Sequence, residues 1–200
     1  MGSMYERKDA YYRQAKKEGY RSRAAYKLTQ IAGKEKAVRA GDRVIDAGAA
    51  PGGWSQVLLE LVGKRGKVAA VDLLPMDPLP GENFRFWRGD LSDAALPAEL
   101  LAFLGGRADV VLSDAAPNTT GSPFTDQARS ADLVRSVFAL ARQTLKEGGT
   151  FLAKIFGGAE SDELFREMKP FFRELRRVRP DATRKESFEL YFLGKGFKGG

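Results

Sequence analysis

The chain has 200 residues, 43% of them hydrophobic, which suits one compact α/β domain but is too short for separate cofactor and substrate domains. Cysteine and histidine are both absent, so disulfides, thiolate zinc sites, cysteine nucleophiles and imidazole acid–base chemistry are excluded. No apolar run is long enough to predict a membrane span, no ligand cluster indicates a metal, and the lack of cysteine fits a cytoplasmic protein.

Positive charge is concentrated near the N-terminus. The net charge is +7, and residues 1–40 hold 11 basic and four acidic side chains. Two helices are predicted there, at 5–19 and 21–34, with a break at Gly19. Four tyrosines alternate with the basic residues: Tyr11, Tyr12, Tyr20 and Tyr26. Cations interleaved with aromatic rings suit phosphate contacts and stacking on unpaired bases, although a solvated basic helix that caps a sheet has the same pattern.

After Asp42, short apolar runs alternate with helical patterns. Strands are predicted at 43–49, 67–73, 84–90, 108–114 and 149–156, with weaker candidates at 173–180 and 188–197. Helices are predicted near 53–62, 94–105, 128–146 and 161–170, the last with Ser161 as its N-cap. This alternation predicts a doubly wound, mostly parallel sheet with helices on both faces. The final two strands should pair antiparallel, because their connection is too short for a crossover helix.

The stretch VIDAGAAPGGW (44–54) predicts a strand, a glycine-rich turn and the start of a helix. Glycine allows close approach of a ligand, and a helix N-terminus favours electronegative groups. The spacing resembles the dinucleotide fingerprint, and Asp72 follows where a carboxylate binds ribose hydroxyls. The loop alone therefore fits NAD and S-adenosylmethionine about equally well as cofactors. Two observations favour S-adenosylmethionine over the pyrophosphate of NAD. The turn has Pro51 and has Ala50 in place of a glycine, and further strand ends have carboxylates, Asp46 and Asp90, which would repel a pyrophosphate.

Three charged residues stand out in or after the apolar strands. Asp114 closes the fourth strand, Lys154 lies late in the fifth, and Glu189 lies in the last. Carboxyl ends of strands form the ligand crevice of an open α/β sheet, so Asp114 and Lys154 should face it. A buried charge needs compensation, which a reaction centre or a structural ion pair would provide; charges placed separately in two apolar strands favour the reaction centre.

Five motifs occur in a characteristic order and spacing: RSRAAYKL, DAGAAPGGWSQ, VDLLPMDP, SDAAPN and FLAKIF. From about Asp9 to the last strand, the sequence resembles the FtsJ (RlmE) family of S-adenosylmethionine-dependent RNA ribose 2′-O-methyltransferases. VDLLPMDP and SDAAPN are much more specific than the glycine loop. One departure is Ala115, where bacterial members usually have methionine, a change that barely affects the chemistry.

The resemblance implies a Rossmann-like methyltransferase fold of seven strands, with the last strand antiparallel. It also implies a catalytic Lys-Asp-Lys-Glu tetrad, whose members are Lys27, Asp114, Lys154 and Glu189. The implied cofactor contacts are Gly52, Trp54, Asp72, Asp90 and Asp114. Residues 1–40 would then form a basic N-terminal helical extension, with a cloning remnant at 1–3, and residues 41–200 the methyltransferase domain.

The expected reaction is methyl transfer from S-adenosylmethionine to the 2′-hydroxyl of a uridine in large-subunit (23S) ribosomal RNA, within the ribosomal subunit. A free lysine, with a pKa of about 10.4, is a poor base at neutral pH. The second cation, Lys27, and burial would favour neutral Lys154, whereas Asp114 and Glu189 oppose this. Lys154 therefore either accepts the hydroxyl proton or orients the hydroxyl. A tRNA substrate, an NAD oxidoreductase and a non-catalytic RNA-binding assembly factor are the alternatives, and the protein is expected to be a monomer.

Overall fold

A seven-stranded sheet forms the centre of the structure, which is a computed structural model that describes residues 12–183 and 187–199. The strands are β1 (Arg43–Ala47), β2 (Lys67–Asp72), β3 (Phe84–Arg88), β4 (Ala108–Ser113), β5 (Leu145–Phe156), β6 (Phe172–Val178) and β7 (Glu189–Phe197). Their order across the sheet is β3-β2-β1-β4-β5-β7-β6. The first five strands pair in parallel, and β7 runs antiparallel to both β5 and β6. The predicted doubly wound sheet with an antiparallel last strand is confirmed.

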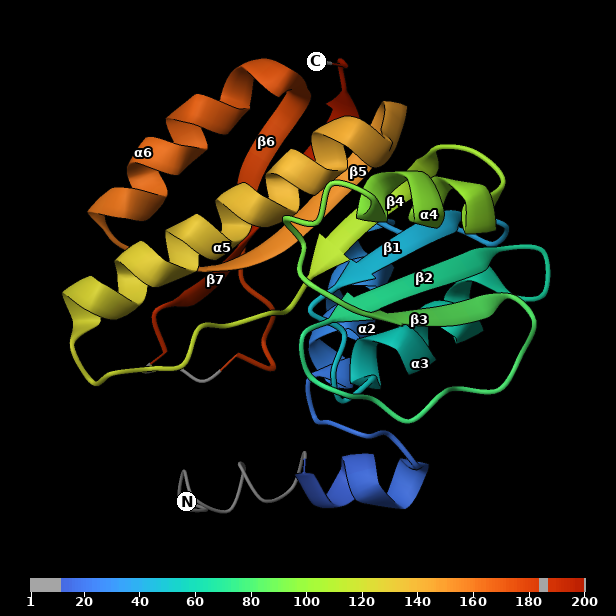
Figure 1. The fold of residues 1–200 in the computed structure, drawn as a ribbon. Coiled ribbons are helices and arrows are strands. Elements are labelled where there is room, and N and C mark those ends of the chain that lie inside the picture. Colours follow the sequence, from blue (N-terminus) through green and yellow to red (C-terminus); the bar gives the residue numbers. More distant parts are fainter. Residues whose placement is uncertain (1–11, 184–186, 200) are drawn as a thin grey trace.

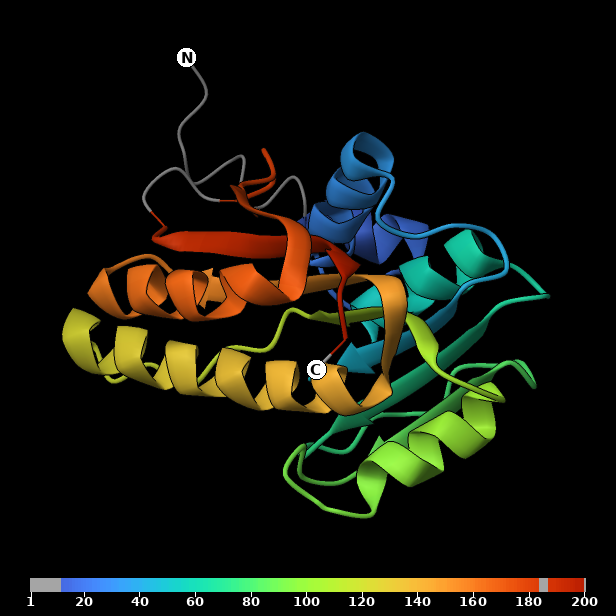
Figure 2. The ribbon, with the colours of Figure 1, turned by 90° about the horizontal axis from the view of Figure 1, so that it is seen from above.

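Helices cover both faces of this sheet, as Figures 1 and 2 show. They are α2 (Ala25–Glu35), α3 (Gly53–Val62), α4 (Leu96–Leu104), α5 (Pro123–Thr144) and α6 (Ala159–Met168), with a short 3₁₀ turn η1 (Lys169–Phe171). One apolar core lies between the sheet and α4, α5 and α6, and a second lies between the sheet and α2 and α3. Alternate residues of each strand enter opposite cores, because side-chain direction alternates along a strand. Leu152 of β5 enters the α2–α3 core, whereas Phe151 enters the other.

The chain reverses its direction of winding at β1. From β1 the sheet grows outward through β2 and β3, and then continues from the other side of β1 through β4. Such a switch leaves a crevice beyond the carboxyl ends of the two strands that flank it. Asp46, in β1, and Asp114, directly after β4, lie at this edge of the sheet.

Several predicted boundaries differ from those in the structure. Ser161 is not the N-cap of α6: the helix begins at Ala159, and Ser161 is its third residue, with its hydroxyl bonded to the backbone of Gly158. Helix α5 begins five residues earlier than predicted, where Pro123 supplies a helical φ at the first position. Strand β5 begins at Leu145, four residues before the predicted start.

The basic N-terminal segment is helical on both sides of Gly19, as predicted. Residues 12–18 are helical, Gly19 has a positive φ of 80°, and α2 begins at Ala25 instead of residue 21. Tyr11 and the rest of the prediction for 5–11 lie outside the described residues. Among the helices that the structure describes, none has the length and apolar character needed to cross a bilayer.

Candidate active site

Four charged side chains from four different elements meet beside the carboxyl end of β4. Lys27 comes from α2, Asp114 directly follows β4, Lys154 lies in β5 and Glu189 begins β7. Lys27 Nζ lies 3.0 Å from Glu189 Oε1 and 3.9 Å from Asp114 Oδ1. Lys154 Nζ lies 3.2 Å from Asp114 Oδ1 and 3.5 Å from Glu189 Oε1. Each ammonium therefore faces both carboxylates, and the formal charges of this tetrad cancel.

The two lysines of the tetrad are almost completely removed from water. Lys27 is 6% exposed and Lys154 is 8% exposed. Isolated ammonium groups at such positions would each cost several kcal/mol of desolvation, which paired carboxylates and hydrogen bonds offset. Lys154 Nζ also donates a hydrogen bond of 2.6 Å to the main-chain carbonyl of Asp114. Burial and pairing together hold the Lys154 amine in one position.

Glu189 is held in its charged form. Burial acts to raise the pKa of its carboxyl, but the charges of Lys27 and Lys154 and the hydrogen bonds from Lys27 and Ser187 outweigh burial, so this pKa lies below its ordinary value. The Ser187 hydroxyl donates to Glu189 Oε2 over 3.2 Å, while Lys27 binds the other oxygen. Both carboxylate oxygens are thus fixed by neighbours.

Tyr191 joins the tetrad, although sequence reasoning did not select it. Its side chain is fully buried, and its hydroxyl donates to Asp114 Oδ1 at 2.6 Å. Burial, followed by the charge of Asp114, raises the pKa of the Tyr191 phenol well above its ordinary value, so it remains a donor. The sequence held one signal for Tyr191: it lies two residues after Glu189, so both side chains share one face of the strand. A tyrosine buried there needs a hydrogen-bond partner for its hydroxyl.

The glycine-rich loop between β1 and α3 lies next to the tetrad. Gly48 has a positive φ of 77°, and a Cβ there would lie 2.3 Å from the Cβ of Ala115, so the loop packs directly against the residue after Asp114. Gly52 caps α3 with a φ of 106°. Asp72, at the end of β2, accepts hydrogen bonds from the backbone N–H groups of Ala50 and Leu74. The carboxylate of Asp72 therefore fixes the loop.

Asp46 is a buried carboxyl group beneath this loop. The Ser55 hydroxyl donates to Asp46 Oδ2 at 2.6 Å, and Oδ1 has no hydrogen-bond partner among the described residues. Burial raises the pKa of Asp46 to about 7, with the charges of Asp114 and Asp72 acting in the same direction and the Ser55 hydrogen bond opposing them. Asp46 therefore keeps its proton to a much higher pH than an ordinary aspartic acid does.

The remaining two predicted cofactor contacts have different surroundings. Trp54 is buried, its indole N–H donates to the Ala24 carbonyl at 2.8 Å, and its ring stacks on Tyr191 with centroids 5.9 Å apart. Its indole thus links the segment before α2 to β7. Asp90 is exposed beyond β3, where hydrogen bonds from the backbone and hydroxyl of Ser92 lower its pKa. Asp90 lies at the carboxyl edge of the sheet, and its contact with the cofactor stays a prediction.

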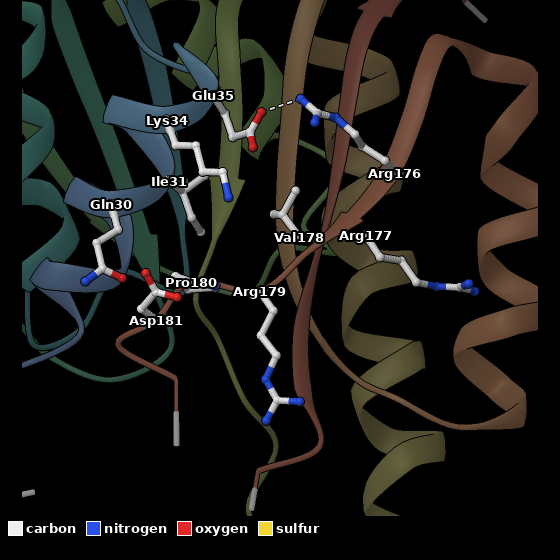
Figure 3. A pocket seen from close by; sticks show the side chains of 10 residues that line it. All are labelled: Gln30, Ile31, Lys34, Glu35, Arg176, Arg177, Val178, Arg179, Pro180 and Asp181. Carbon is white, nitrogen blue, oxygen red and sulfur yellow. Dashed lines mark hydrogen bonds and ion pairs between the residues drawn. The ribbon is translucent and has the colours of Figure 1, made fainter. Parts of the chain in front are cut away.

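A pocket of about 400 Å³ lies between α2 and β6. Figure 3 shows Lys34 directed into this α2–β6 pocket, whereas Arg177 points away from it. Its basic lining residues outnumber the acidic ones, Glu35 and Asp181. Glu35 pairs with Arg176 across the pocket. Lys34 lies two helical turns beyond Lys27 on α2, so the pocket continues from the tetrad along one face of this helix.

No group of three or more His, Cys, Asp or Glu side chains within 12–183 and 187–199 is arranged to hold a metal ion. The candidate active site consists of the glycine-rich loop with its neighbouring carboxylates and the adjoining charge-neutral tetrad.

Comparison with known proteins points to one family. Residues 20–197 match the family described as FtsJ-like methyltransferase. A protein named ribosomal RNA large subunit methyltransferase E from Methanothermobacter thermautotrophicus is 49% identical over 193 residues, covering 96% of this chain and 92% of the relative. The protein of the same name from Archaeoglobus fulgidus is also 49% identical, over 98% of this chain and 99% of its own length.

A solved structure has the same fold. The crystal structure of a ribosomal RNA methyltransferase from Plasmodium falciparum superimposes with a TM-score of 0.79 at 29% identity. The match covers 90% of this chain and all of that chain. The Rossmann-like methyltransferase fold expected from the sequence is confirmed.

Asp46 makes the stability of the protein depend on pH. Its folded-state pKa of about 7 lies above its ordinary value of 3.8, so its contribution to stability is complete below about pH 3.8 and is lost as pH rises through 7. Asp46→Asn cannot ionise at this position. The difference in unfolding free energy between this variant and wild type should therefore shift in favour of the variant by roughly 2–3 kcal/mol from pH 5 to pH 8. Urea unfolding of both proteins at the two pH values measures this difference. A difference that is the same at both pH values would contradict the assignment.

Proposed function

Because the chain belongs to the FtsJ-like methyltransferase family, it is an S-adenosylmethionine-dependent methyltransferase, and we propose that it methylates the ribose 2′-hydroxyl of a uridine in large-subunit (23S) ribosomal RNA. The relatives at 49% identity are named for the large-subunit ribosomal RNA, and they align with nearly the whole chain. The observation that carries the proposal is the buried tetrad of Lys27, Asp114, Lys154 and Glu189 beside the glycine-rich loop.

The residues of the loop fit the methyl donor. S-adenosylmethionine supplies an activated methyl group on a cationic sulfonium and also carries an amino group. The carboxylates at the ends of β1, β2 and β4 suit such cations, and the unpartnered Oδ1 of Asp46 marks an electronegative site beneath the loop. We assign donor binding to Gly52, Trp54, Asp72, Asp90 and Asp114, with Trp54 acting through its packing.

The tetrad suits transfer to an alcohol. As the ribose oxygen bonds to the methyl carbon and the carbon–sulfur bond breaks, with its electron pair left on sulfur, the hydroxyl proton must leave. We assign the Lys154 amine as the acceptor of that proton, once its ammonium has released a proton of its own. Lys27 and Glu189 hold the ribose and Lys154 in line, and Asp114 connects the donor side to the tetrad, since its carboxylate contacts both lysines and Tyr191.

The charge distribution supports an RNA partner. The net excess of basic residues lies within residues 1–40, where the helix over 12–18 and α2 flank Gly19. The α2–β6 pocket extends this basic surface from the tetrad past Lys34. We propose that the pocket takes a backbone phosphate of the RNA strand that leads to the target ribose, within the assembling ribosomal subunit.

The protein would act as a monomer in the cytoplasm, with residues 1–40 as an RNA-binding extension and residues 41–200 as the methyltransferase domain. The packing of α2 beside α3 in one apolar core means that this extension would be rigidly attached through α2. A tRNA substrate remains the second candidate, because some relatives that share the N-terminal sequence pattern modify tRNA.

Labelled methyl transfer tests the function. The protein and labelled S-adenosylmethionine are incubated with unmodified large ribosomal subunits, free ribosomal RNA and tRNA, and the modified nucleotide is mapped. We expect 2′-O-methyluridine in large-subunit RNA. Label confined to tRNA would favour the second candidate, and RNA binding without transfer would support a non-catalytic assembly factor.

Lys154 variants test the proton-acceptor role in the same assay. Lys154→Ala and Lys154→Arg should both lower the rate at least 100-fold, because arginine stays charged and accepts no proton. Binding of S-adenosylmethionine, measured by calorimetry, should change little and serves as the folding control. Substantial activity in Lys154→Arg would instead assign Lys154 to orienting the hydroxyl.

Lys34→Ala tests the RNA path. Loss of one phosphate contact should weaken binding of a single-stranded RNA oligonucleotide and reduce the slope of log affinity against log salt by about 0.7. Lys64→Ala is the matched control, since Lys64 is exposed between α3 and β2 at the opposite edge of the sheet. Equal effects of the two variants in fluorescence anisotropy would show that the α2–β6 pocket is not a specific contact.

A further inference from the structure

A second pocket lies where α5 begins, beside Phe156 at the end of β5 and Phe188 directly before β7. The loop after β4 and the first turn of α5 form one wall, and the ends of β5 and β7 form the other. Its volume is about 240 Å³, and Pro123, Gln127, Phe156, Ser187 and Phe188 line it. We call it the Phe188 pocket.

The Phe188 pocket is continuous with the tetrad. Phe156 is paired directly with Glu189 across β5 and β7, and the backbone N–H of Gly157 donates to the Phe188 carbonyl at 2.8 Å. Ser187 lines the pocket while its hydroxyl donates to Glu189 at 3.2 Å. A group held by Glu189 therefore has this pocket as its immediate neighbour.

The side chain of Phe188 is exposed to solvent and does not contribute to either apolar core. Its side chain is 68% exposed, although it lies next to a buried strand and beside Phe156. Unlike Phe124, which is about equally exposed, Phe188 lies in the lining of a pocket beside the tetrad, so its ring offers apolar surface at the edge of a charged site. Exposed aromatic rings are the common platform on which proteins stack unpaired bases.

The charge of the pocket disfavours a phosphate. No lysine or arginine lines it among the described residues, and its one acidic side chain, Asp126, already accepts hydrogen bonds from Thr120 and Gly121. Gln127 contributes an amide, which offers both a donor and an acceptor to the edge of a base. The lining thus combines apolar surface with a neutral polar group.

We propose that the Phe188 pocket receives the base of the target nucleotide, which stacks on the Phe188 ring while its ribose lies at the tetrad. This inference rests on the proposed ribose methylation. In a nucleotide the base is attached to the carbon adjacent to the one that bears the 2′-hydroxyl, so the base must lie directly beside the group that Glu189 and Lys154 hold. The volume is below the roughly 300–1,000 Å³ of pockets for drug-sized ligands and suits one nucleobase.

The kinetic test compares three variants on unmodified large ribosomal subunits. Phe188→Ala should lower kcat/KM for the subunits by about 5- to 150-fold, the range of losses when a base–aromatic stack is truncated, and should leave the KM for S-adenosylmethionine unchanged. Phe188→Trp should retain most of the activity. Phe124→Ala is the matched control, because Phe124 is 74% exposed at the start of α5 but does not line the pocket. Equal losses in Phe188→Ala and Phe124→Ala, or no recovery in Phe188→Trp, would overturn the proposal.

A binding test separates this proposal from the proposed function. A single-stranded RNA oligonucleotide that contains one 2-aminopurine is titrated with each variant in the absence of a methyl donor. Wild type and Phe124→Ala should quench its fluorescence more than Phe188→Ala does. Quenching that is equal in all three proteins would refute base stacking on Phe188 even if transfer occurs. A difference in quenching without any methyl transfer would refute the proposed function and retain the base pocket.

Discussion

The site depends on the mutual compensation of two lysines and two carboxylates in a place that excludes water. Lys27 and Lys154 each contact both Asp114 and Glu189, so removal of any one member would leave the tetrad with a net buried charge. Such networks are seldom the most stable solution, because well-packed apolar side chains of similar volume do as well or better. The arrangement is therefore best understood as a reaction centre that the surrounding fold supports.

The fold brings these charges together from distant parts of the chain. β4, β5 and β7 are neighbours in the sheet, and their shared edge places Asp114, Lys154 and Glu189 side by side. Lys27 arrives from outside the sheet, on α2. The stack of Trp54 on Tyr191, and the hydrogen bond from Trp54 to Ala24, connect α3, β7 and the start of α2. The same side chains that fill the core thereby set the distances within the tetrad.

Much of this arrangement was predictable because it follows local patterns. The strands were identified by apolar runs, and Lys154 and Glu189 stood out as charges within such runs. Lys27 did not stand out, since a lysine in a basic helical segment looks like any solvated lysine, and only the family resemblance selected it. The structure shows that Lys27 lies on the buried face of α2.

Other features depend on tertiary contacts that no local pattern encodes. Tyr191 resembles an ordinary core aromatic until Asp114 is placed opposite its hydroxyl. The burial of Asp46 requires α3 to cover the end of β1. The prediction that Ser161 caps α6 was wrong because a serine at the third helical position can bond back to the preceding backbone as well as a true cap.

If the tetrad is a reaction centre, its buried charges serve chemistry and are not needed for folding. A variant that combines Lys27→Met, Asp114→Leu, Lys154→Met and Glu189→Leu with Tyr191→Phe removes the tetrad and its tyrosine partner at once. The decisive measurement is its free energy of unfolding in urea. We expect a cooperatively folded protein that is as stable as wild type or more stable, with no methyl transfer to RNA. A loss of stability by several kcal/mol would contradict the account and identify the tetrad as structural.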